Sequence, residues 1–318
     1  MSFRVVNTSP LDPVCVQWLE QRVDLKDCDH RDQQELHELL GSADALVIGT
    51  YLQVNAALLD LAPKLKVVGR AGVGLEHVDL AECRRRQLPV VHTPEANTQA
   101  VVEYVVALIL DALRPRPALD VSIDAELYLS LRCTEVGQQL DQLTLGILGF
   151  GRIGKRLGAV AHAIGMNVIV NDVLSEKELQ ATVDYPFQWV EKTALYQQCD
   201  VLSIHVDGRP ENRHLIGSQQ LSQLRPHCLI VNAARGMIMD ESALVQWAQQ
   251  TRQQGGQAVL DVVDPEPPSA DCPLLELSNV RVLPHLAART YPALQSMGWV
   301  VRDVWSVLQG EQPRYPAW

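Results

Sequence analysis

The chain has 318 residues, of which 47% are hydrophobic, and its formal net charge is −11. This length allows two domains with cores of their own, and the acidic balance argues against nucleic-acid or anionic-membrane binding. The seven cysteines have no CxxC or zinc-like spacing, which predicts free thiols and no metal site. We find no signal-peptide pattern and no apolar segment of membrane-spanning length. We therefore expect a cytoplasmic protein.

Residues 1–97 alternate strands and helices. Strands are predicted at 3–6, 45–48, 65–68 and 89–92, and helices at 14–21, 32–40, 56–61 and 80–86. This alternation predicts a parallel sheet that is covered on both faces. The unit ends near Asn97-Thr98, where Thr98 could cap a long helix over 99–113.

The stretch from Leu143 to Asp172 reads as strand, glycine turn, helix, strand and acid, and its turn is Gly149-Phe150-Gly151-Arg152-Ile153-Gly154. The first glycine allows a tight turn, the second lets a pyrophosphate approach the backbone, and the third lets the helix sit close to the strand. The pyrophosphate would rest on N–H groups at the helix N-terminus. The predicted cofactor-binding residues here are Gly149, Gly151, Arg152, Ile153 and Gly154.

Asp172 follows the second strand of this stretch, where a carboxylate can accept hydrogen bonds from an adenosine ribose. It would also repel a 2′-phosphate, and no arginine occurs in Val173-Leu174-Ser175 to hold one. The sequence therefore favours NAD over NADP.

Strands predicted at 200–205, 228–231, 257–260 and 281–283 continue this second unit, and an amphipathic helix at about 291–308 ends the chain. Arg235, Asp261, Glu266 and His285 follow three of these strands, and the carboxyl ends of parallel strands meet at one edge. Arginine can hold a carboxylate with two hydrogen bonds. Histidine can exchange a proton near neutral pH beside an orienting carboxylate. These residues are therefore candidates for catalysis.

The chain resembles the D-isomer-specific 2-hydroxyacid dehydrogenases over essentially its whole length. The similar segments are RAGVGLEHVDL, PEANTQAVVEYV, LGILGFGRIG, NAARGMIMDESAL, DVVDPEPP and LPHLAART. The resemblance implies an α/β protein with two Rossmann-like, doubly wound lobes. An NAD-binding Rossmann domain (98–289) would be inserted in a flavodoxin-like substrate domain (1–97 with 290–318). It also implies a homodimer.

The resemblance assigns the catalytic roles to Arg235, Glu266 and His285, and the nicotinamide-amide contact to Asp261. The substrate-binding residues implied are Tyr51, Gly72, Val73, Gly74 and Asn97. Thr98, His205 and Ala233 complete the cofactor-binding set. Without the resemblance, His205 and His214 are interpreted as structural residues.

The sequence departs from the family at Gly49-Thr50-Tyr51, where phosphoglycerate-specific members carry an arginine. We therefore expect a small unphosphorylated 2-oxo or 2-hydroxy acid as substrate, because a phosphate without a cation would lose its hydration uncompensated. Arg70, or Arg132 of a partner subunit, could supply that cation. A second departure is Asp207-Gly208, where relatives commonly carry Pro-Leu near the cofactor. The region between 113 and 143 is shorter than usual and lacks a Gly-x-Trp.

Two alternatives to this enzyme remain open. The first is an NAD(H)-sensing binding protein similar to the corepressor branch of the family, in which turnover is incidental. The second is a dehydrogenase of the phosphite or formate type. Turnover with a panel of 2-oxo acids distinguishes them.

Overall fold

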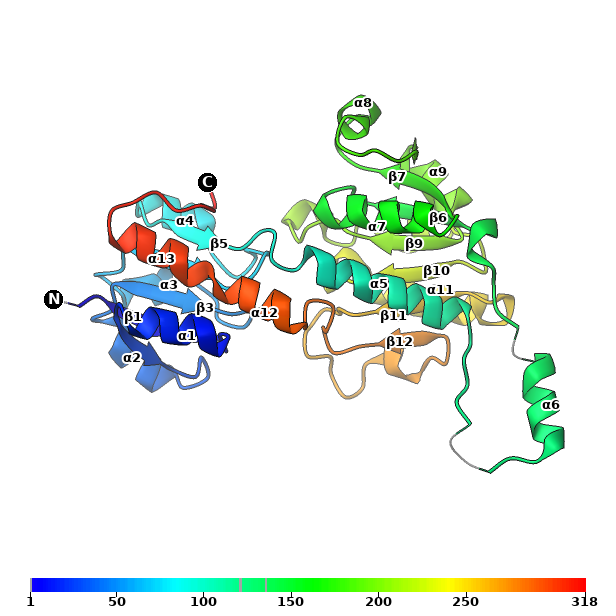
Figure 1. The fold of residues 1–318 in the computed structure, drawn as a ribbon, viewed down its shortest axis with the longest axis horizontal. Helices are drawn as coiled ribbons and strands as arrows, with labels where there is room; N and C mark the ends of the chain where they lie inside the picture. The colour runs from blue at the N-terminus through cyan, green and yellow to red at the C-terminus, as the bar shows by residue number, and fades with distance from the viewer. Residues whose placement is uncertain (1, 120–121, 135) are drawn as a thin grey trace. The chain divides into compact units, whose positions relative to one another are not determined.

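The computed structural model describes residues 2–119, 122–134 and 136–318 (Figure 1). The chain forms two compact units, one of Met1–Asn97 with Ala288–Trp318 and one of Thr98–Ala287. In Figure 1 the first unit runs from blue to cyan and returns in orange and red, and the second runs from green to orange. Each unit is an α/β layer structure around a parallel sheet, so the predicted fold class is confirmed.

The sheet of the first unit has the strand order β2-β1-β3-β4-β5, which is the flavodoxin-like order. Its strands are β1 (Arg4–Asn7), β2 (Asp24–Asp27), β3 (Ala45–Ile48), β4 (Val67–Arg70) and β5 (Val90–His92). Its helices are α1 (Pro13–Glu20), α2 (Gln33–Leu40), α3 (Ala56–Asp60), α4 (Leu80–Arg85), α12 (Tyr291–Gly298) and α13 (Val300–Leu308).

Alternate residues of these strands enter two separate cores. On β3, Leu46 and Ile48 pack with apolar residues of α2, α3 and α4. Ala45 and Val47 pack on the opposite face, with residues of α1 and α13. Helices on both faces explain why β3 is buried along its whole length.

The structure differs from the predicted elements of this unit at three places. β2 was not predicted because its sequence, DLKD, is charged, and backbone pairing with β1 forms it instead. β4 begins two residues later than the strand predicted at 65–68 and extends through Arg70. The predicted final helix is two helices, α12 and α13, separated at Trp299. There Gly298 packs closely against Cys15 of α1.

The second unit contains a parallel sheet with the order β12-β11-β10-β9-β6-β7-β8, which contains the Rossmann arrangement and one further strand. Its strands are β6 (Thr144–Leu148), β7 (Asn167–Asn171), β8 (Gln188–Trp189), β9 (Val201–Ile204), β10 (Leu229–Asn232), β11 (Gln257–Leu260) and β12 (Val280–Val282). Its helices are α5 (Thr98–Leu113), α6 (Ala125–Thr134), α7 (Arg152–Ala163), α8 (Glu176–Gln180), α9 (Lys192–Gln198), α10 (Ser218–Leu221) and α11 (Glu241–Thr251).

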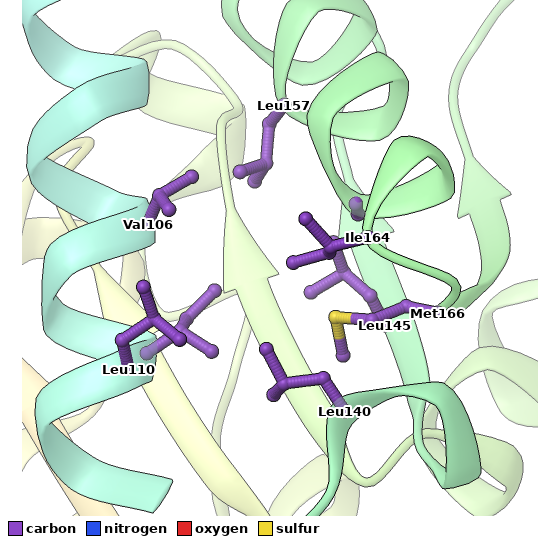
Figure 2. Close-up of a pocket in the computed structure, with 9 residues that line it drawn as sticks. Val106, Leu110, Leu140, Leu145, Leu157, Ile164 and Met166 are labelled. Carbon is purple, nitrogen blue, oxygen red and sulfur yellow. The ribbon is translucent and has the colours of Figure 1, made fainter. Parts of the chain in front are cut away.

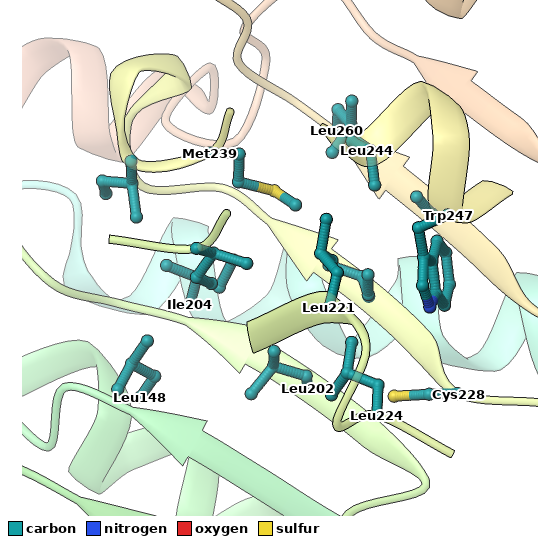
Figure 3. Packing of buried hydrophobic residues seen from close by; sticks show 14 of the residues in the cluster. Leu148, Leu202, Ile204, Leu221, Leu224, Cys228, Met239, Leu244, Trp247 and Leu260 are labelled. Atoms are coloured by element: carbon teal, nitrogen blue, oxygen red, sulfur yellow. The ribbon is translucent and has the colours of Figure 1, made fainter. Parts of the chain in front are cut away.

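Apolar side chains from α9, α10 and α11 cover one face of this sheet, and Figure 3 shows Leu202, Leu221 and Trp247 in that core. A small cavity remains between α5 and α7, lined only by apolar residues such as Val106 and Leu157 (Figure 2). Its lining has no polar side chain that could bind a charged ligand, so we interpret the cavity as a packing void in the apolar core. α5 begins at Thr98 itself, and the predicted cap role of Thr98 is therefore wrong. Asn97 precedes the helix and is also a favoured cap residue.

Candidate active site

Arg235 lies in the loop that follows β10, and the buried side chain of Asn232 shapes this loop. Asn232 Oδ1 accepts the Ala234 N–H at 3.0 Å, and its Nδ2 donates to the Arg235 carbonyl at 3.0 Å. The half-buried Arg235 side chain donates from Nη1 to the Ala234 carbonyl at 2.6 Å. The loop therefore holds a guanidinium at the carboxyl end of the sheet. The half-buried Ala233 lies in the same loop.

His285 and Glu266 form a hydrogen-bonded pair, with 2.8 Å between His285 Nδ1 and Glu266 Oε2. Glu266 Oε1 also accepts the Val263 N–H at 3.3 Å. Burial alone would raise the pKa of Glu266. The hydrogen bond and charge of His285, the Val263 N–H and the charge of Arg235 outweigh it, and hold the pKa below its ordinary value. Glu266 is therefore a carboxylate at neutral pH, and Nε2 of His285 is left to exchange a proton.

Asp261 is fully buried at the end of β11, next to the loop that carries His285. Its carboxylate accepts the Leu286 N–H at 2.8 Å and the Ala287 N–H at 2.9 Å. Its backbone carbonyl accepts the His285 N–H at 2.9 Å. The sequence predicts Asp261 as a contact of the cofactor, and these loop contacts could not be inferred from sequence.

The glycine turn of the second unit has the geometry that a dinucleotide pyrophosphate requires. Gly149 has a φ of +92°, and a Cβ there would lie 2.7 Å from the His205 carbonyl carbon. A Cβ on Gly154 would collide with the Gly149 carbonyl oxygen, whereas a Cβ on Gly151 would meet nothing within 4 Å. Gly151 precedes α7, whose first-turn N–H groups are those of Arg152, Ile153 and Gly154. Open space over N–H donors at a helix N-terminus fits a pyrophosphate.

Asp172 follows β7 and is bonded into the same turn. Its carboxylate accepts the Phe150 N–H at 2.6 Å and the Leu174 N–H at 3.0 Å. Arg209 lies within electrostatic range of Asp172: its ion pair with Asp207 and, more weakly, the charge of Asp172 raise the pKa of Arg209. In the sequence, the residues next to Asp172 give no sign of Arg209, because Arg209 belongs to the later loop that follows β9.

His205 follows β9 beneath the glycine turn. Its Nε2 lies 2.8 Å from Ser203 Oγ, and its buried Nδ1 has no hydrogen-bond partner among the described residues. Burial lowers the pKa of His205 to about 4. The backbone of His205 lies directly against Gly149 and so supports the glycine turn. His214, by contrast, is exposed.

The depressed pKa of His205 makes the stability of the fold depend on pH. The folded protein keeps the ring neutral down to about pH 4, whereas an unfolded chain protonates it below about 6.5. The stabilisation is therefore present above pH 6.5 and is lost as the pH falls toward 4. Between pH 7.5 and 5, the unfolding free energy of the native protein should fall by about 2 kcal/mol more than that of His205→Gln. Urea unfolding of both proteins measures this, with His37→Gln on the exposed face of α2 as control. Parallel pH curves for native protein and His205→Gln would contradict it.

The first unit carries the residues predicted to bind substrate. Gly72 follows β4, and its N–H donates to the Arg70 carbonyl at 2.8 Å. Among the described residues, neither the Val73 N–H nor the Gly74 N–H donates to a backbone carbonyl. Two N–H groups are thus available to an anion. Tyr51 is 67% exposed, and its ring stacks on His30.

Arg70 is the cation that the sequence argument left open, and the structure brings it to this loop. The residue is buried, its Nη2 lies 3.4 Å from Thr50 Oγ1, and its Nη1 donates to the Ala71 carbonyl. The segment Gly49-Thr50-Tyr51 therefore has a positive neighbour, although it contains none itself. Asn97 is half-buried at the end of this unit.

The order of strands and the geometry of the glycine turn define the second unit as a dinucleotide-binding domain. A family profile described as "D-isomer specific 2-hydroxyacid dehydrogenase, NAD binding domain" matches residues 106–287. A hydroxypyruvate reductase of Thermotoga maritima is 30% identical over 299 residues, which are 93% of this chain and 95% of that relative. The chain belongs to the D-isomer specific 2-hydroxyacid dehydrogenase family, whose members are oxidoreductases.

Two further relatives show the range of the family. A D-3-phosphoglycerate dehydrogenase of Methanocaldococcus jannaschii is 33% identical over 309 residues, which are 97% of this chain and 58% of that relative. The chain spans about half the length of the phosphoglycerate dehydrogenases that it matches. The structure of a D-lactate dehydrogenase from Aquifex aeolicus, complexed with NAD and lactic acid, has a TM-score of 0.81 at 26% identity, covering 97% of this chain and 96% of that one. Within the described residues, no helix is long and apolar enough to cross a membrane.

Proposed function

We propose that this protein is an NAD-dependent oxidoreductase that transfers a hydride between NAD(H) and a small 2-oxo or 2-hydroxy acid. The observation that carries the proposal is the His285–Glu266 pair at 2.8 Å, in the unit that also contains Arg235 and the glycine turn. A proton donor, a carboxylate that orients it and a guanidinium for the substrate carboxylate are the groups that reduction of a 2-oxo acid needs.

In the direction of reduction, the keto carbon accepts a hydride from NADH and its oxygen accepts a proton, so that a 2-hydroxy acid and NAD⁺ are formed. His285 gives this proton from Nε2, because Nδ1 is bonded to Glu266. Glu266 keeps the imidazole oriented for this transfer. Arg235 holds the substrate carboxylate and stabilises the charge that develops on the keto oxygen. In the first unit, the Val73 and Gly74 N–H groups are further candidates for binding an anion.

Asp172 should decide between the two nicotinamide dinucleotides. Its carboxylate repels a 2′-phosphate and accepts hydrogen bonds from a ribose, so NADH should bind better than NADPH. Asp172→Ala should reduce the difference between the NADH and NADPH dissociation constants. Because Arg209 is a cation near Asp172, the double variant with Arg209→Gln should bind NADPH more weakly than Asp172→Ala does. Fluorescence titration of both dinucleotides measures these affinities, and Lys192→Ala, at the start of α9, is the control. Equal affinity of the native protein for NADH and NADPH would overturn the choice of NAD.

For the substrate, we propose an unphosphorylated acid such as glyoxylate, pyruvate or hydroxypyruvate. The segment Gly49-Thr50-Tyr51 contains no cation, and Tyr51 offers an aromatic ring to an apolar or weakly polar side chain. The second candidate is a phosphorylated acid. The buried Arg70 near Thr50 favours it, and several relatives are D-3-phosphoglycerate dehydrogenases.

A panel of 2-oxo acids tests the function and distinguishes the candidates. Reduction is followed by NADH absorbance, and kcat/KM is compared between hydroxypyruvate and 3-phosphohydroxypyruvate at matched ionic strength. We expect the unphosphorylated acid to have the higher kcat/KM. A tenfold preference for the phosphorylated acid, lost in Arg70→Gln, would establish the second candidate. Turnover of phosphite or formate alone would indicate the dehydrogenases of that type. NADH binding without turnover of any acid would support a sensing protein instead.

We also propose that the protein is a homodimer. Supporting this, no residue of α6 is buried, and Leu127, Tyr128 and Leu129 are 47%, 49% and 56% exposed. A cluster of exposed apolar side chains on one helix is typical of a subunit interface. Sedimentation equilibrium should therefore give twice the chain mass of 35.3 kDa, and Leu129→Glu should lower it. A native monomer at micromolar concentration would rule the dimer out.

A further inference from the structure

We propose that Asp261 is a positioning residue for His285: it fixes the turn that presents the imidazole. This inference rests on the proposed function, in which His285 is the proton donor. It adds to that function a residue that acts through the His285 backbone, whereas the family resemblance implied only a contact with the cofactor.

Three consecutive backbone N–H groups end on Asp261. The His285 N–H donates to its carbonyl, the Leu286 N–H to Oδ1 and the Ala287 N–H to Oδ2, at 2.8–2.9 Å. Asp261, which directly follows β11, therefore binds the backbone of three consecutive residues, from His285 to Ala287. A shift of Asp261 would move the histidine backbone with it.

The conformation of His285 explains why such a clamp is needed. Its φ is +54°, in the left-handed region that residues other than glycine rarely adopt. A residue persists in this region when its surroundings hold it there. The contact between His285 Nδ1 and Glu266 depends on this backbone, so the clamp on the turn also sets the orientation of the ring.

The carboxylate of Asp261 is already occupied within the protein. Burial and the nearby charge of Asp261 raise the pKa of Tyr104, on α5, to about 12, so the Tyr104 hydroxyl lies close to this carboxylate. The Leu286 and Ala287 N–H groups each use one of its two oxygens. Asp261 is also fully buried. A buried carboxylate with these partners holds the loop that carries His285.

Asp261→Asn tests this inference, because the amide has nearly the same shape but its Nδ2 cannot accept the second loop N–H. We expect kcat for the 2-oxo acid to fall at least tenfold, while the NADH dissociation constant changes less than threefold. The pH profile of kcat should also shift, because the His285–Glu266 contact loosens. Asp240→Asn is the matched control: Asp240 also accepts a backbone N–H, from Ala243 at the start of α11, away from His285. It should leave the pH profile unchanged.

A cofactor analogue separates positioning from a nicotinamide contact. In 3-acetylpyridine adenine dinucleotide a methyl group replaces the amide nitrogen, so no N–H remains to reach Asp261. If Asp261 positions His285, the ratio of native to Asp261→Asn kcat is the same with NADH and with the reduced analogue. If the ratio falls to about one with the analogue, Asp261 acts on the nicotinamide and the inference is wrong.

Hydrogen exchange supplies a readout that does not depend on turnover. The Leu286 and Ala287 amides should exchange at least tenfold faster in Asp261→Asn than in the native protein, and Tyr104→Phe should have a smaller effect of the same kind. If Asp261→Asn changes neither the exchange of these amides nor the pH profile of kcat, the positioning role is wrong and the proposed function still stands. A native protein that reduces no acid overturns the proposed function, and with it the part of this inference that concerns catalysis.

Discussion

Replacing His285 by alanine should lower 2-oxo acid reduction by about 10²-fold or more, the usual contribution of a general acid, while NADH binding is preserved. The expectation follows from the pair at 2.8 Å: with Nδ1 bonded to Glu266, the imidazole has one nitrogen left to give a proton to the keto oxygen. The lowered pKa of Glu266 keeps its carboxylate charged at neutral pH. Steady-state kinetics and NADH titration on the same preparation measure both effects.

The control for this variant has to match its backbone as well as its side chain. His214 has a φ of +51°, close to the +54° of His285, and its side chain is exposed. His214→Ala therefore places alanine in the same left-handed conformation, away from the Glu266 pair. It should cost similar stability and leave turnover within about twofold. If His285→Ala reduces the acid as fast as His214→Ala does, His285 is not the proton donor.

The sequence predicted those parts of the site that depend on one local pattern. The ends of β10, β11 and β12 lie at one edge because parallel strands run the same way, so Arg235, Asp261 and His285 could be grouped from strand positions alone. The glycine turn was predictable because its spacing carries its own geometry. The fold class followed from the alternation of strands and helices.

What the sequence did not predict depends on contacts between distant segments. Arg70 lies beyond the strand that the sequence predicts at 65–68, and pairing of β4 with β3 and β5 extends the strand to it. Arg209 reaches the neighbourhood of Asp172 from a loop that follows β9. The clamp from Asp261 to Leu286 and Ala287 joins residues 25 and 26 positions apart. The residue pattern within a single helix or strand cannot predict contacts of this kind.

Replacing Arg235 by glutamine should lower kcat/KM for a 2-oxo acid by about 10²- to 10⁴-fold, because arginine holds a carboxylate with two hydrogen bonds and each contributes about 1.5–3 kcal/mol. If Arg235 holds the carboxylate in the ground state as well as in the transition state, most of the change should be in KM. Arg235→Lys keeps the charge without the planar fork, so it should restore only part of the loss. Arg252→Gln, at the end of α11, is the control for removal of an exposed arginine.

The decisive comparison uses a substrate without the carboxylate charge. Methyl pyruvate keeps the keto group of pyruvate but carries an ester where Arg235 would bind. The native protein should therefore prefer pyruvate strongly, and Arg235→Gln should lose most of that preference, since the removed arginine and the removed charge are two ends of one interaction. If Arg235→Gln lowers kcat/KM by the same factor for the acid and for its ester, the guanidinium acts on the keto oxygen or on Glu266, to which it is electrostatically coupled.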